Sequence, residues 1–79
     1  MKASVIKKLE QASMYYKRIE ACLNDAYDKA YDGPTEYFHF LDGTTRTTAS
    51  LIFEMLSDAI NERVYIEGKI EVFNKEYKE

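Results

Sequence analysis

The sequence predicts an all-α fold: two long antiparallel helices that form a helical hairpin, joined by a short aromatic elbow and assembled as a homo-oligomer. Apolar residues recur at steps of three and four in two long segments. The run Asp32-Gly33-Pro34 separates these segments with residues that end helices. More apolar residues are present than two facing helices can cover. With 79 residues, the chain forms one helical-hairpin domain spanning residues 1–79.

The first predicted helix covers residues 4–31. Charged residues fill the side opposite its apolar stripe, as in an amphipathic helix. Gly33 suits a left-handed cap after the helix, and Pro34 cannot continue it. The stripe consists of Val5, Leu9, Ala12, Tyr16, Ile19, Leu23, Ala26 and Ala30.

The second predicted helix covers residues 45–77, and Arg63 is the single charged interruption of its stripe. Val64, Ile66, Ile70 and Val72 also alternate as strand residues would, so residues 63–73 could form a β-hairpin around Gly68. We favour the helix because a tight hairpin would mix apolar and charged side chains on each face. The stripe consists of Ile52, Leu56, Ala59, Arg63, Ile66, Ile70, Phe73 and Tyr77.

Residues 34–43 form the predicted elbow, a short helical turn followed by a bend at Asp42-Gly43. A domain this small usually needs a disulfide, a metal or further subunits to fold, and one cysteine supplies neither of the first two. We therefore expect a homo-oligomer. It would bury the apolar residues left outside the two stripes: Ile6, Met14, Tyr15, Tyr27, Leu51, Phe53 and Ile60.

Composition limits the kinds of binding partner and the cellular compartment that we expect for this chain. The net charge of −3, from 11 basic and 14 acidic residues, disfavours binding to a nucleic-acid duplex. No segment approaches the ~20 apolar residues of a membrane span, so no membrane partner is expected. A single cysteine and an N-terminus without a signal-peptide core indicate the cytoplasm.

Residues suited to catalysis are few. His39 is the only histidine and has no nucleophile at a meaningful spacing, and Cys22 flanks the first stripe as a buried small hydrophobe would. No group of residues has the spacing of a metal site or of a catalytic acid–base pair. The sequence therefore predicts a protein that is not an enzyme and that needs no cofactor.

The best functional lead is the run Thr44-Thr45-Arg46-Thr47-Thr48 at the start of the second helix. A helix start presents free backbone N–H groups, threonine hydroxyls add donors, and Arg46 could grip a phosphate with two hydrogen bonds. Tyr37, Phe38 and Phe40, just before this run, could supply flat faces for a nucleobase. In the alternative interpretation, Thr44 or Thr45 is an ordinary helix cap and Arg46 pairs with an acidic neighbour.

This stretch resembles the second helix of the small phage proteins that sequester cyclic oligonucleotide signals in anti-CBASS defence, and of a related anti-Thoeris sponge. The residues that carry the resemblance are Arg46, Thr47, Phe53, Leu56, Ala59 and Ile60.

The resemblance implies a homo-oligomer, often a hexamer, that binds a cyclic di- or trinucleotide between subunits without cleaving it. Arg46, Thr47 and Ser50 would contact phosphate, together with Thr45. The family also has a basic residue early in its first helix, which corresponds to Lys7 or Lys8 here; we assign Lys8 to the predicted ligand site. The protein would then act in the cytoplasm of a phage-infected cell. The alternative function is a small helical phage or mobile-element protein that inhibits a host protein by direct binding.

Overall fold

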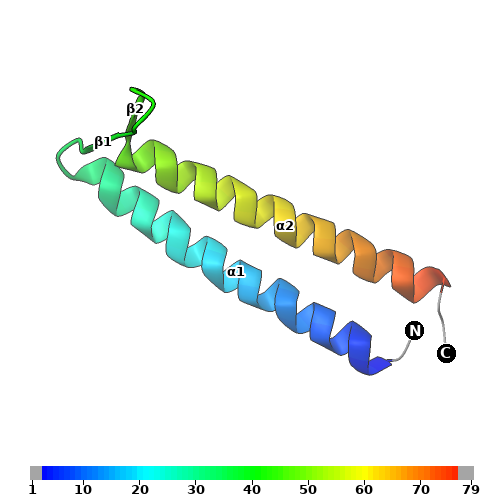
Figure 1. Ribbon diagram of the computed structural model, residues 1–79. Coiled ribbons are helices and arrows are strands. Elements are labelled where there is room, and N and C mark those ends of the chain that lie inside the picture. Colours follow the sequence, from blue (N-terminus) through cyan, green and yellow to red (C-terminus); the bar gives the residue numbers. More distant parts are fainter. Residues whose placement is uncertain (1–2, 77–79) are drawn as a thin grey trace.

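The computed structural model describes residues 3–76 and shows two long helices packed as an antiparallel hairpin (Figure 1). Helix α1 spans Ala3–Asp32 and helix α2 spans Thr48–Glu76. Strands β1 (Tyr37–His39) and β2 (Thr45–Thr47) lie between them in sequence and sit at the end of the molecule where α1 stops and α2 begins. The described chain is elongated, with extents of 54 × 27 × 15 Å. The predicted helical hairpin is thus confirmed.

The stripe predicted for the second helix faces α1. From Ile52 to Phe73 its members are half-buried, and Ala59 is buried, with 8% of its surface exposed. Tyr77 lies outside the described residues. Residues 63–73 are helical throughout, so the alternative β-hairpin does not form.

The stripe predicted for the first helix is only partly correct. Leu9, Tyr16 and Leu23 are half-buried, but Val5 and Ile19 are exposed. The face of α1 turned toward α2 carries polar residues in addition. It consists of Leu9, Ser13, Tyr16, Glu20, Leu23, Tyr27 and Ala30, at alternating steps of four and three. Ile19 is displaced from this face because Glu20 occupies it, opposite Arg63.

The elbow is a β-hairpin rather than the predicted helical turn. β1 and β2 pair antiparallel, with Tyr37 opposite Thr47, Phe38 opposite Arg46 and His39 opposite Thr45. The predicted bend at Asp42-Gly43 is present: the N–H of Gly43 donates to the carbonyl of Phe40 at 3.0 Å, and Gly43 has a φ of 87°. This left-handed conformation favours glycine.

Two further sequence predictions need correction. Gly33 does not adopt a left-handed cap conformation; its N–H simply donates to the Lys29 carbonyl at 3.2 Å, as one more bond of the helical ladder. Cys22 is exposed rather than buried. Neither of the described helices has a stretch that is long and apolar enough to cross a membrane.

Candidate functional site

The candidate site lies at the junction between the β-hairpin and α2, where each threonine has a different environment. Thr44 donates from its N–H and its hydroxyl to the Asp42 carboxylate, at 2.9 and 2.7 Å. These hydrogen bonds from Thr44, the hydroxyl's above all, lower the pKa of the Asp42 carboxyl. Thr45 shares a hydrogen bond of 3.1 Å between its hydroxyl and Nδ1 of His39. Both threonines therefore stabilise the hairpin and neither caps the helix.

The cap of α2 is Thr47. Its hydroxyl oxygen accepts a hydrogen bond of 3.1 Å from the N–H of Ser50, which lies three residues further along the chain. This is the geometry of a helix N-cap. The expectation that Thr44 or Thr45 would be the cap is wrong by two or three residues. The error arises because β2 extends through Thr47, which delays the start of the helix.

Arg46 lies in β2 and not in the first turn of α2, as the sequence had led us to expect. Its guanidinium reaches over the beginning of the helix. Nη2 donates to the Ser50 hydroxyl oxygen at 2.8 Å and to the Ser50 carbonyl at 3.4 Å, and Nη1 contacts the Glu54 carboxylate. The acidic partner foreseen in the alternative interpretation is thus present. The Arg46 side chain nevertheless stays 38% exposed.

Exposed apolar side chains lie on the same β-hairpin as this guanidinium. Tyr37 and Phe38 on β1 are 58% and 51% exposed, and Phe40 and Leu41 follow them toward the turn, also exposed. Phe38 stands opposite Arg46 in the sheet. Flat aromatic surface and a partly exposed cation therefore occur within one small element.

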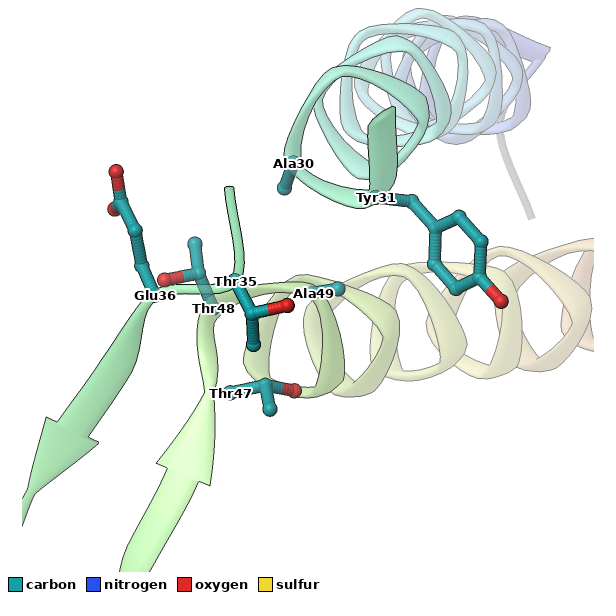
Figure 2. Close-up of a pocket in the computed structure, with 7 residues that line it drawn as sticks. All are labelled: Ala30, Tyr31, Thr35, Glu36, Thr47, Thr48 and Ala49. Atoms are coloured by element: carbon teal, nitrogen blue, oxygen red, sulfur yellow. The ribbon is translucent and has the colours of Figure 1, made fainter. Parts of the chain in front are cut away.

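A hollow of about 270 Å³ lies beside the junction, between the last turn of α1 and the start of α2 (Figure 2). It combines hydroxyl groups with one carboxylate and does not include Arg46. Inside its wall the hydroxyl oxygen of Thr48 is buried and lacks a hydrogen-bond partner among the described residues. Its lining residues are Ala30, Tyr31, Thr35, Glu36, Thr47, Thr48 and Ala49.

The structure joins three of the predicted site residues by hydrogen bonds, whereas Tyr37 and Thr45 lie on the face of the two-stranded sheet opposite to Arg46. Arg46 bonds to Ser50, Ser50 bonds to Thr47, and Tyr37 pairs with Thr47 across the sheet. Thr45 lies one residue away from Arg46 and contacts His39 instead. Lys8 is separated from the group: it lies about 36 Å along α1 from the end of that helix, near the opposite end of the molecule. Within one chain it cannot share a ligand with Arg46.

A second polar cluster was not predicted, and it lies in the middle of the helix interface. Arg63 donates from Nε to Glu20 at 2.5 Å and from Nη1 to Glu67 at 3.2 Å, and Ser13 donates to Glu67 at 2.8 Å. The hydrogen bond from Ser13, followed by that from Arg63, lowers the pKa of Glu67, while the contacts with Glu20 and Glu67 raise the pKa of Arg63. The charged interruption of the second stripe was the signal that could have revealed this cluster.

Histidine, cysteine and acidic side chains do not gather into a possible metal site anywhere in residues 3–76. The chain matches no protein-family model, no curated protein and no solved structure. The resemblance to the phage sponges therefore rests on the six residues quoted for it.

Proposed function

We propose that the protein is a non-enzymatic binding module that sequesters a cyclic di- or trinucleotide immune signal, in the manner of the phage sponges that it resembles. It would do so as a homo-oligomer, such as the hexamer that the resemblance implies, in the cytoplasm of the infected host. The phosphate would be held by Arg46 with the hydroxyls of Thr45, Thr47 and Ser50, and Tyr37 would offer a face to the base. Lys8 would come from another copy of the chain.

The observation that supports this proposal best is the arrangement of Arg46. Ser50 holds one end of the guanidinium, and an anion, the Glu54 carboxylate, already occupies the other end. A phosphate oxygen could replace that carboxylate with the same charge and hydrogen-bond geometry. The exchange costs little, because an exposed ion pair contributes only ~0–1 kcal/mol, whereas a hydrogen bond to a charged group contributes ~1.5–3 kcal/mol.

Two substitutions test the site, and we expect them to change the nucleotide affinity in opposite directions. Arg46→Ala should weaken nucleotide binding by ~1.5–3 kcal/mol, roughly tenfold to a hundredfold, because a phosphate contact is lost. Glu54→Gln should strengthen binding by up to about fivefold, because it removes the competing carboxylate without changing the size of the side chain. Calorimetric titration of both variants and the wild type with a panel of cyclic di- and trinucleotides provides the measurement.

The alternative function is inhibition of a host protein by direct binding. The observation that favours it is the exposed apolar tip of the hairpin, where Phe38 and Phe40 are about half exposed and Leu41 is fully exposed. Exposed apolar patches of this kind often mark protein interaction sites. If the wild type binds no nucleotide of the panel, the sponge proposal fails and this alternative takes its place. If wild type and Arg46→Ala bind equally well, the nucleotide site lies elsewhere.

A further inference from the structure

A polar cluster interrupts the apolar contact between the two helices and consists of Ser13, Glu20, Arg63 and Glu67. The side chains of Arg63 and Glu20 are 22% and 16% exposed, and Ser13 is 7% exposed. Charged side chains lose hydration when they are covered, and apolar side chains of similar size often stabilise a protein as well as the ion pair does. The stability of the hairpin alone therefore does not explain this cluster.

The apolar contacts by themselves do not determine how the helices are aligned. The facing residues recur at steps of four and three on both helices, so each pattern repeats every seven residues. Sliding one helix along the other by seven residues, about 10 Å, would again place stripe against stripe. Either helix could likewise pack against the same helix of a second copy. The connecting residues 33–47 are long enough when extended to let the hairpin slide or open.

The ion pair between Glu20 and Arg63 distinguishes the observed alignment from these alternatives. Arg63 and Glu67 lie one turn apart on α2, so their contact is available in any arrangement of the helices. Glu20 comes from α1, and its carboxylate meets Arg63 only where residue 20 lies beside residue 63. After a slide by seven residues, Glu20 would lie against apolar side chains such as Leu56 or Ile70. A covered carboxylate without a partner is strongly destabilising.

We propose that the ion pair between Glu20 and Arg63 determines the alignment of α1 and α2, because it restricts them to the one arrangement in which both covered charges are compensated. A single polar position fixes the register of coiled coils in the same way, at a cost in stability. The inference goes beyond the proposed function and does not depend on a nucleotide. It separates two roles of the ion pair: a large effect on alignment and a small effect on stability.

Glu20→Leu/Arg63→Leu tests the proposal by replacing the ion pair with apolar side chains. The melting temperature should stay the same or rise, because no charge of the pair is then covered. The alignment should no longer be unique. Glu67→Gln is the matched control, since it changes the same cluster but keeps the ion pair, and it should align as the wild type does.

An exchange of the two charges provides a second test. Glu20→Arg places two guanidinium groups against each other and should abolish the wild-type alignment. Glu20→Arg/Arg63→Glu should restore it, because the charges across the interface attract again. Circular dichroism records whether each variant keeps its helices.

Distances between two nitroxide labels measure the alignment. The labels are attached through Asp25→Cys on α1 and Lys75→Cys on α2, two positions in exposed ion pairs, in a chain that also carries Cys22→Ser. Pulsed electron–electron double resonance is recorded with an excess of the same chain unlabelled, so that the distances arise within one molecule. A slide by seven residues changes the separation along the helix axis by about 10 Å, and opening of the hairpin lengthens it further.

We expect one distance for the wild-type cluster, for Glu67→Gln and for Glu20→Arg/Arg63→Glu, and two or more distances for Glu20→Leu/Arg63→Leu. A single, unchanged distance in the apolar variant would overturn the proposal. Loss of helices in that variant would overturn it as well, because the ion pair would then be needed for stability itself. The proposal is equally wrong if Glu20→Arg keeps the wild-type distance or if the charge exchange does not restore it.

Discussion

Local hydrogen bonds account for most of the hydroxyl groups that first drew attention to residues 44–48. Thr44 closes a turn, Thr45 contacts His39 and Thr47 caps α2. Thr48 is the exception, because its hydroxyl oxygen is buried without a partner in the described structure. Two adjacent residues of the same type therefore have opposite energetic roles.

The same substitution at these neighbours should have effects of different sign. Thr47→Val removes the helix cap and should reduce the free energy of unfolding by ~1 kcal/mol. Thr48→Val keeps the shape of the side chain and removes a buried hydroxyl without a partner, so stability should stay the same or rise by up to ~1 kcal/mol. Thermal denaturation followed by circular dichroism measures both. A larger loss at Thr48 than at Thr47 would refute this assignment.

Gly68 is a second residue whose role is clear from its surroundings. It lies inside α2, and a Cβ atom added there would meet nothing within 4 Å apart from its chain neighbours and the backbone of its own helix. Gly68→Ala should therefore stabilise the protein by ~1 kcal/mol, which raises the melting temperature by about 4–8 °C for a domain of this size. Gly43→Ala is the contrasting variant and should destabilise, because Gly43 has a φ of 87°. A lower melting temperature for Gly68→Ala would indicate a neighbour that the isolated chain does not show.

At the scale of the elements, the two helices followed from local periodicity and the hairpin did not. The spacing from Ile52 to Phe73 is a property of consecutive residues, and it predicted the face that α2 turns toward α1. The pairing of Tyr37 with Thr47 depends on residues ten positions apart, so the aromatic run alone could not distinguish a strand from a helical turn. The site residues were found by type, but the partners of Arg46 required the position of β2.

The polar cluster between the helices makes stability depend on pH. Hydrogen bonds from Ser13 and Arg63 lower the pKa of Glu67 below its ordinary 4.5 in the folded protein. Because the pKa of Glu67 is lower in the folded than in the unfolded protein, ionised Glu67 stabilises the fold at pH values above its ordinary pKa. This stability is lost as the pH falls from about 4.5 through the pKa of the folded protein. Lys17 and Glu20 also act on the cluster, through Glu67 and Arg63 respectively.

Glu67→Gln should remove this contribution. The difference in melting temperature between wild type and Glu67→Gln should be largest near neutral pH and should shrink below about pH 4.5. The matched variant Glu71→Gln, one turn further along α2 in an exposed ion pair with Lys75, should show little difference at any pH. A Glu67→Gln difference that stays constant from neutral to acid pH would mean that the cluster does not hold Glu67 ionised.

At the scale of the whole molecule, folding and association are expected to be one process. Almost no side chain of the described hairpin is completely buried. Large apolar side chains remain exposed along both helices, among them Tyr15, Phe53 and Tyr65. A domain with so thin a core has little stability of its own. We expect association to supply the remaining free energy, which would make stability a function of protein concentration.

The melting temperature of the wild type should accordingly rise with protein concentration. For a dimer, a tenfold increase adds about 1.4 kcal/mol, and the unfolding entropy of two chains of this length converts that to a shift of about 4 °C. Differential scanning calorimetry across two decades of concentration makes the comparison. A wild-type melting temperature independent of concentration would show that the single hairpin is stable without a partner, and that the exposed residues along its helices serve another contact.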